Sequence, residues 1–156
     1  MPEARKMQAR NPEYAQRVQE SFALQGAMRT LGASLAAIEP GRVVIAMRHR
    51  PELTQQHGFV HAGMIAAALD SACGFAAFTL MPADAGVLTI EFKINLLAPA
   101  RGPQLSFEGE VTKGGRTISV VDGRAWQSET EGGERKLVAT MTATVMTVVG
   151  RDDVRH

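Results

Sequence analysis

The chain has 156 residues, which is most simply one domain with a core of its own. Apolar residues make up 45% and charged residues 21%, a composition typical of a globular protein and not of a disordered one. The net charge of +1 provides no general field that would attract nucleic acid or an anionic membrane. The single cysteine, Cys73, and a polar N-terminal stretch without an apolar signal core favour a soluble cytoplasmic protein.

The first third of the chain predicts a tail, a helix and two strands. Residues 1–11 read as a disordered basic tail, and Asn11-Pro12 resembles a helix cap followed by proline in the first turn. The apolar spacing from Tyr14 onwards predicts an amphipathic helix that ends near Gly32. Strands are expected over residues 33–38 and 42–50, joined at a Glu-Pro-Gly turn.

A second, longer helix is expected from about Ala62 to Leu80, closed by Pro82 and Gly86. It is rich in alanine, the best helix former and a residue small enough to let a helix pack closely into a curved sheet. Asp70 interrupts this apolar helix, and packing alone does not explain it.

The rest of the chain reads as strands separated by short polar turns. Residues 87–96 alternate strictly, with Leu88, Ile90, Phe92, Ile94 and Leu96 on one face, which predicts a half-buried strand. Further strands are expected over 104–112, 117–127 and 137–149, the last with Leu137, Ala139, Met141, Ala143 and Val145 on one face. Short turns favour an antiparallel meander. The fold class is therefore α+β, with the helix covering one face of the sheet.

The order of these elements resembles the hotdog fold, and more specifically the acyl-CoA thioesterases of the phenylacetate-pathway (PaaI-like) type. The matching features are Gln55, Gly58, the His-Ala-Gly triplet at 61–63, Asp70 nine positions after His61, the run FKINLLAPARG and Gly115-Arg116-Thr117. The resemblance covers roughly residues 20–148. It implies one hotdog domain over residues 12–150, in which an antiparallel sheet wraps a long central helix and an extra helix precedes them.

The resemblance also implies a site shared between two subunits. Asp70 and Thr89 would come from one chain of a homodimer, and Gln55 and Ala62 from the other. Such dimers can pair into tetramers. The sequence departs from the family pattern at Ala62, where a glycine is usual, and at Gln55, where asparagine is frequent.

The chemistry of thioester hydrolysis accounts for these residue types. Asp70 can act as nucleophile or as base for water, and Gln55 can orient the water or hold the carbonyl. Free N–H groups of Ala62 and Gly63 at a helix start favour an oxyanion. The expected site residues are, for catalysis, Asp70, Gln55, His61, Ala62 and Thr89, and for substrate binding, Gly58, Gly63, Gly115, Arg116 and Thr117. The acyl-CoA substrate carries its own coenzyme A, so no separate cofactor is expected.

Each of these residues also has a plainer interpretation. His57 and His61 precede the helix and have no obvious third ligand, so no metal site is predicted, and His61 is better read as fixing the turn. Cys73 reads as packing. Arg116 suits either a solvated turn or a CoA phosphate.

Two other functions use the same fold or ligand. A hotdog hydratase or dehydratase needs a histidine working with its acid, and none follows one turn after Asp70. A non-catalytic acyl-CoA sensor usually carries an added pair of DNA-binding helices, whereas residues 1–31 predict at most one helix. The preferred prediction is hydrolysis of an aromatic or medium-chain acyl-CoA, with no nucleic-acid or membrane partner.

Overall fold

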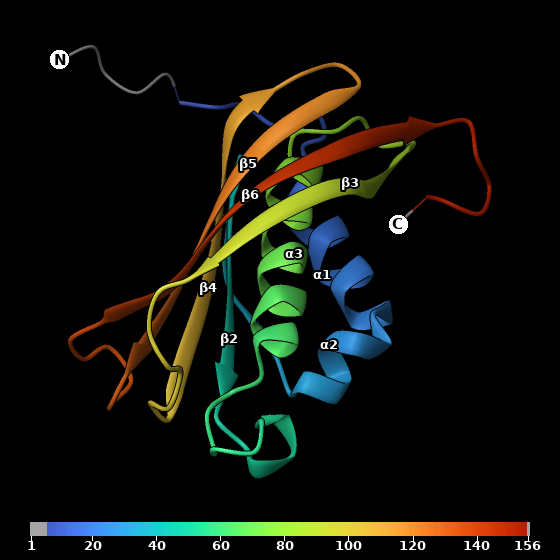
Figure 1. Cartoon of the computed structure of the whole chain (residues 1–156). Helices are drawn as coiled ribbons and strands as arrows, with labels where there is room; N and C mark the ends of the chain where they lie inside the picture. Colours follow the sequence, from blue (N-terminus) through green and yellow to red (C-terminus); the bar gives the residue numbers. More distant parts are fainter. Residues whose placement is uncertain (1–5, 156) are drawn as a thin grey trace, which may run out of the picture.

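The computed structural model describes residues 6–155 and confirms the predicted α+β class: an antiparallel sheet curves around one long helix (Figure 1). The helices are α1 (Tyr14–Leu24), α2 (Gly26–Leu31) and α3 (Ala62–Phe78), with a short 3₁₀ turn at Pro51–Leu53. The strands are β1 (Ser34–Glu39), β2 (Arg42–Arg48), β3 (Ala85–Leu96), β4 (Gln104–Gly114), β5 (Ile118–Ser128) and β6 (Lys136–Val149). No helix among residues 6–155 is long and apolar enough to cross a bilayer.

The sheet has the strand order β1-β2-β4-β5-β6-β3, and every neighbouring pair is antiparallel. The predicted meander therefore holds for β4, β5 and β6. Strand β3, however, pairs with β6 and not with β4, which follows it in the chain. This crossover makes β3 an edge strand, a placement that the short turns did not predict.

Helix α3 lies in the concave face of the sheet, as its alanine content predicts. Ala68, Ala72 and Ala76 are fully buried. A Cβ atom on Gly109 of β4 would come within 2.4 Å of the carbonyl oxygen of Ala72. The backbone of α3 therefore rests directly on β4, and only small residues on both elements permit this approach.

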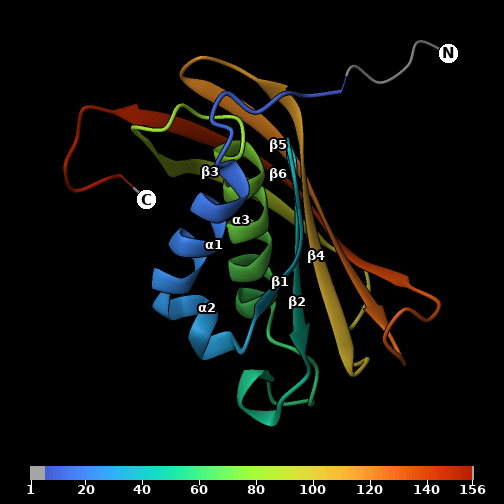
Figure 2. The same ribbon diagram turned by 180° about the vertical axis from the view of Figure 1, so that it is seen from behind.

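The single N-terminal helix that the sequence predicts is two helices. Gln25 has extended backbone angles (φ −80°, ψ 100°) and separates α1 from α2, which follow one another along α3 (Figure 2). Gly32 ends α2 in the left-handed conformation, close to the predicted end. The Asn11 side chain accepts a hydrogen bond from the Glu13 N–H (3.0 Å), in the turn that leads into α1.

Part of the predicted tail has a defined path. Residues 1–5 lie outside the described residues, and residues 6–10 form neither helix nor strand. Met7 nevertheless packs against the core, and its sulfur would be 2.6 Å from a Cβ atom on Gly41. Residues 6–10 therefore run along the surface of the domain, attached through Met7.

The predicted burial of the apolar face of β3 is wrong for the single chain. Four of its five large apolar side chains are well exposed: Leu88 (43%), Ile90 (52%), Phe92 (41%) and Leu96 (52%). Because β3 is at the edge of the sheet, its second side has no neighbouring strand. An exposed apolar edge of this length is a template for pairing with another chain.

The alternation in β3 is also interrupted by a bulge at Ile90. Thr89 pairs with Val145 and Glu91 with Thr144, so Ile90 has no partner. Thr89 and Phe92 consequently point to the same, helix-facing side. A similar shift on β6 leaves Val138 without a partner on β5 and turns Leu137 away from the otherwise buried face.

Candidate active site

Asp70 points from α3 towards the start of β3. Its Oδ1 accepts a hydrogen bond from the Thr89 hydroxyl at 2.7 Å. Thr89 reaches the carboxylate because it pairs with Val145, a buried residue of β6, and so lies on the helix-facing side of the sheet. The structure thus brings together the two residues that the family resemblance places on one chain.

The carboxyl group of Asp70 is half-buried. Burial raises its pKa above the ordinary aspartate value, and the hydrogen bond from Thr89 opposes that shift because it stabilises the charged form. A desolvated carboxylate is a stronger base and nucleophile than a solvated one. This environment distinguishes Asp70 from an aspartate that merely faces solvent.

A cavity of about 290 Å³ opens beside the carboxylate. Its lining is Ser21, Gln25, Asp70, Ser71, Gly74, Phe75, Val87, Leu88 and Thr89. The Ser71 hydroxyl donates to the Gln25 side-chain oxygen at 2.8 Å. Gln25, the residue between α1 and α2, is thereby held in the wall of this cavity. Gln25 and Ser71 are not among the site residues predicted from the sequence.

The start of α3 supplies one free N–H group and not two. His61 caps the helix: its Nδ1 accepts a hydrogen bond from the Gly63 N–H at 2.8 Å. This confirms that His61 fixes the turn, and it corrects the prediction that Gly63 offers its N–H to an oxyanion. Among the described residues, nothing accepts the N–H of Ala62.

Gln55 and Gly58 shape the loop before α3. The Gln55 side-chain oxygen accepts a hydrogen bond from the His57 N–H. Among the described residues, the amide NH₂ group of the same side chain has no hydrogen-bond partner. Gly58 has φ +83°, a conformation that favours glycine, and its carbonyl accepts from His49 Nε2 at 2.9 Å. Gln55 and Ala62 line a separate cavity of about 350 Å³, together with the segment Leu96–Ala100.

The two halves of the predicted site are apart in one chain. Asp70 follows Ala62 by eight residues on α3, which corresponds to about 12 Å along the helix axis. An oxyanion donor must lie about 3 Å from the substrate oxygen while the nucleophile attacks the adjacent carbon. One copy of Asp70 and the Ala62 N–H of the same chain cannot serve one carbonyl group.

The third set of predicted residues lies near the C-terminal end of α3. Gly115 and Arg116 line a cavity of about 600 Å³ that does not include Asp70, and the carbonyl of the neighbouring Thr117 accepts from the Thr147 N–H at 2.8 Å. Cys73 is buried, and burial above all, with the nearby Asp70 and Asp122 charges, raises the pKa of its thiol to about 12. It is a packing residue, as predicted.

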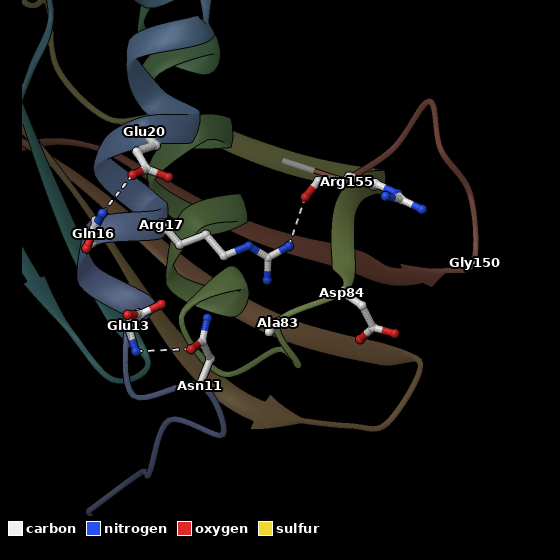
Figure 3. Close-up of a pocket in the computed structure, with 9 residues that line it drawn as sticks. All are labelled: Asn11, Glu13, Gln16, Arg17, Glu20, Ala83, Asp84, Gly150 and Arg155. Atoms are coloured by element: carbon white, nitrogen blue, oxygen red, sulfur yellow. Dashed lines mark hydrogen bonds between the residues drawn. The ribbon is translucent and has the colours of Figure 1, made fainter.

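One further cavity, of about 540 Å³, lies on the outer side of α1 (Figure 3). It is lined by Glu13, Glu20 and Asp84 together with Arg17 and Arg155. The Arg17 guanidinium donates to the carbonyls of Pro82, Ala85 and Arg155, and it lies 4.5 Å above the Phe78 ring. This arginine joins α1 to the α3–β3 loop, so the cavity surrounds a structural contact and not a reactive group.

Comparison with known proteins gives the same family that the sequence resembles. The family model described as "Thioesterase superfamily" matches residues 57–134. A crystal structure of a thioesterase family protein from Silicibacter pomeroyi is 51% identical, with a TM-score of 0.84, and the match covers 88% of this chain and 99% of that one. The PaaI protein of the phenylacetic acid degradation operon of E. coli has a TM-score of 0.77 at 18% identity, covering 88% and 95%.

A relative in Saccharolobus solfataricus, named for an inferred esterase activity, is 36% identical over 92 residues. The match covers 59% of this chain and 65% of the relative, so the chain spans less than two thirds of that protein's length. The likeness to PaaI, at its low identity, shows the fold alone. Together the matches confirm the hotdog fold and the thioesterase resemblance.

Proposed function

The chain belongs to the thioesterase superfamily, and from that premise we propose that it hydrolyses an acyl-CoA thioester to the free acid and coenzyme A. The observation that carries this proposal is the desolvated Asp70 carboxylate, held by the Thr89 hydroxyl at the edge of a cavity. A carboxylate in this setting has the basicity and the fixed orientation that attack on a thioester requires.

Asp70 acts as nucleophile or as general base. As a nucleophile, its oxygen bonds to the carbonyl carbon, the C–S bond breaks, and water then hydrolyses the mixed anhydride. As a base, it takes a proton from water while the hydroxide oxygen bonds to the carbonyl carbon. In both routes the leaving thiolate takes up a proton and one water molecule is consumed, so no cofactor is required.

The negative charge that develops on the thioester oxygen is stabilised at the start of α3. The Ala62 N–H points out of the first turn, where the helix dipole is positive. His61 fixes this turn by holding the Gly63 N–H. The free amide NH₂ group of Gln55, in the same cavity as Ala62, positions the thioester carbonyl or the attacking water.

Two copies of the chain build each site in this proposal. The separation of about 12 Å along α3 means that Ala62 and Gln55 serve the Asp70 of a second copy. The apolar edge of β3 is the surface that fits a two-fold partner, because it is exposed and adjoins Thr89. The assembly is then a homodimer, alone or paired into a tetramer.

The acyl group lies in the cavity beside Asp70, whose apolar lining is Phe75, Val87 and Leu88. A volume of about 290 Å³ is at the lower limit for a small-molecule site, as expected where a partner completes the walls. The lining suits an aromatic or medium-chain acid. Arg116, with Gly115 and Thr117, contributes to binding the CoA phosphates.

The activity is tested with a panel of aryl-, short- and medium-chain acyl-CoA thioesters, followed by release of free thiol. We expect turnover on at least one aromatic or medium-chain substrate. A parent protein that binds acyl-CoA but releases no thiol from any member would favour the acyl-CoA sensor instead.

The shared site is tested by complementation. Ala62→Pro removes the proposed oxyanion donor, while proline fits the first helical position and His61 already has the extended conformation that a following proline requires (φ −60°, ψ 136°). We expect this variant and Asp70→Asn each to be nearly inactive. Co-expressed in equal amounts, they should recover roughly a quarter of the parent activity, because half of the dimers then hold one intact site. Recovery of none would contradict the shared site.

A further inference from the structure

The cavity of about 600 Å³ at the C-terminal end of α3 has one wall that the family resemblance does not include. Residues 6–10 cross this end of the molecule beside the β4–β5 turn (Figures 1 and 2). The cavity is lined by Lys6, Met7, Gln8, Arg10, Ala77, Leu80, Met81, Pro82, Gly114, Gly115, Arg116, Ser119 and Thr147. The N-terminal segment thus faces the turn that carries Arg116.

The charge in this cavity has a single sign. Lys6, Arg10 and Arg116 are its only charged lining residues, and no carboxylate lies among them. Within residues 6–155, none of the three forms an ion pair. The cavity around Arg17 differs, because three carboxylates balance its two arginines. Three uncompensated cations around one hollow favour a ligand with several negative charges.

The N-terminal segment is anchored between its two cations, Lys6 and Arg10. Met7 lies between them and packs against Gly41, whose N–H donates to Thr79 Oγ1 (2.8 Å) and whose carbonyl accepts from the Val111 N–H (2.8 Å). Gly41 has φ +81°, and a Cβ atom there would be 2.6 Å from the Met7 sulfur. The segment is therefore fixed at a rigid point of the fold, next to the cavity.

The remaining walls suit the other parts of a nucleotide. Ala77, Leu80, Met81 and Pro82 form an apolar surface on which a base can lie. Gly115 leaves no room for a side chain, since a Cβ atom would be 2.1 Å from the Ile118 carbonyl oxygen, so a ligand meets its backbone directly. The Ser119 and Thr147 side chains add hydroxyl groups.

This cavity adjoins the one beside Asp70. Thr147 lines the first, Val87 lines the second, and the two residues pair directly across β6 and β3. Ala77 lies seven residues after Asp70 on α3, or about 10 Å along the axis. A ligand that extends from the carboxylate towards the end of the helix would approach the cavity that Arg116 lines.

We propose that residues 6–10 form part of the binding site for the phosphate-bearing nucleotide end of the substrate, with Lys6 and Arg10 joining Arg116 around its phosphates. The segment then sets the preference for full-length CoA thioesters over shortened pantetheine thioesters. This inference rests on the proposed thioesterase function for its substrate, but binding of the nucleotide is measurable without turnover.

The test is the double variant Lys6→Gln/Arg10→Gln, with Arg124→Gln on the exposed outer side of β5 as a control for the loss of a cation away from the cavity. For the double variant, we expect KM for acyl-CoA to rise roughly tenfold or more, with kcat unchanged and KM for acyl-pantetheine within twofold of the parent. Arg124→Gln should change neither KM. Equal changes in both KM values, or no change for acyl-CoA, would overturn the proposal.

A second variant separates position from charge. Met7→Ser keeps both cations but removes the apolar anchor, so KM for acyl-CoA should again rise while KM for acyl-pantetheine does not. Parent KM values in this variant would mean that the anchoring has no role.

Calorimetric binding of adenosine 3′,5′-bisphosphate, a fragment of CoA, distinguishes the two proposals. We expect the parent to bind this fragment and the double variant to bind it at least tenfold more weakly. If the parent hydrolyses no thioester yet binds the fragment through Lys6 and Arg10, the thioesterase proposal fails and this one stands. If the parent hydrolyses acyl-CoA but both proteins bind the fragment equally, this proposal fails alone.

Discussion

Two aspartate–threonine pairs, one on each side of the sheet, have nearly the same geometry. On the helix-facing side, Thr89 donates to Asp70 at 2.7 Å, and on the outer side Thr112 donates to Asp122 at 2.9 Å. Asp122 projects from β5 opposite Glu110 and Thr142 of the neighbouring strands. Asp70 projects from an apolar helix, next to a cavity.

The comparison shows that the hydrogen bond alone does not indicate a reactive group. What sets Asp70 apart is the cavity beside it and the burial that raises its pKa. Burial of the charged Asp70 carboxylate makes folding less favourable, because the carboxylate loses part of its hydration in the folded protein. An arrangement of this kind, without an obvious structural gain, is typical of functional sites.

The largest expected difference between the pairs is in turnover. Asp70→Asn keeps the shape and the bond from Thr89 but removes the charge, so kcat should fall by roughly a hundredfold or more. Asp122→Asn should leave kcat within about twofold of the parent. Steady-state thiol release measures both. A similar loss in the two variants would mean that the pairs do not differ in function.

Asp70→Asn should lower turnover without lowering the stability of the folded protein. The folded-state pKa of Asp70 is raised, so its charged form opposes folding at neutral pH, and this penalty disappears as the pH falls through the folded-state pKa. Asp70→Asn should therefore melt at the parent temperature or above it. A Tm several degrees lower, with normal turnover per folded enzyme, would identify Asp70 as a structural residue.

A smaller effect is expected from the threonines. Thr89→Val removes the bond that lowers the pKa of Asp70, so the acidic limb of the kcat/KM profile should move to higher pH and kcat/KM should fall roughly tenfold. Thr89→Ser should restore the limb, since it keeps the hydroxyl. Thr112→Val on the outer side is the control. A shift of the acidic limb of the kcat/KM profile in that variant would contradict the claim that only the Asp70–Thr89 pair affects activity.

The smallest effect concerns the cap of α3. His61→Ala loses the acceptor for the Gly63 N–H and should cost about 1 kcal/mol of stability, with a decrease of a few-fold in kcat as the first turn loosens. Asparagine is a good cap, so His61→Asn should retain both properties. Thermal melting and thiol release follow the two variants, and an Asn variant as impaired as the Ala variant would assign His61 a role beyond capping.

Much of the helix-facing side was predictable from the sequence. The alanine content of residues 62–78 indicated close packing, and the family pattern singled out Asp70 and Thr89. The N–H of Gly63 was misjudged because an N-terminal N–H counts as free only until a cap is assigned, and a histidine at that position can provide one.

The errors on the rest of the fold have a common cause. Alternation in residues 87–96 shows that one face is apolar, but it does not say whether the same chain or another covers it. Neither the pairing of β3 with β6 nor the break at Gln25 leaves a local signal, because tertiary contacts decide them.

The bulge at Ile90 gives β3 two halves that are out of phase with each other. Thr89 and Phe92 differ by three positions yet share a side. The helix-facing residues of β3 therefore have odd numbers before Ile90 and even numbers after it. Deletion of this one residue would restore a regular frame. Either Thr89 would then turn away from Asp70, or Phe92 and the residues that follow it would change sides. An enzyme can thus lose the partner of its carboxylate through a shortened strand, with every site residue still present in the sequence.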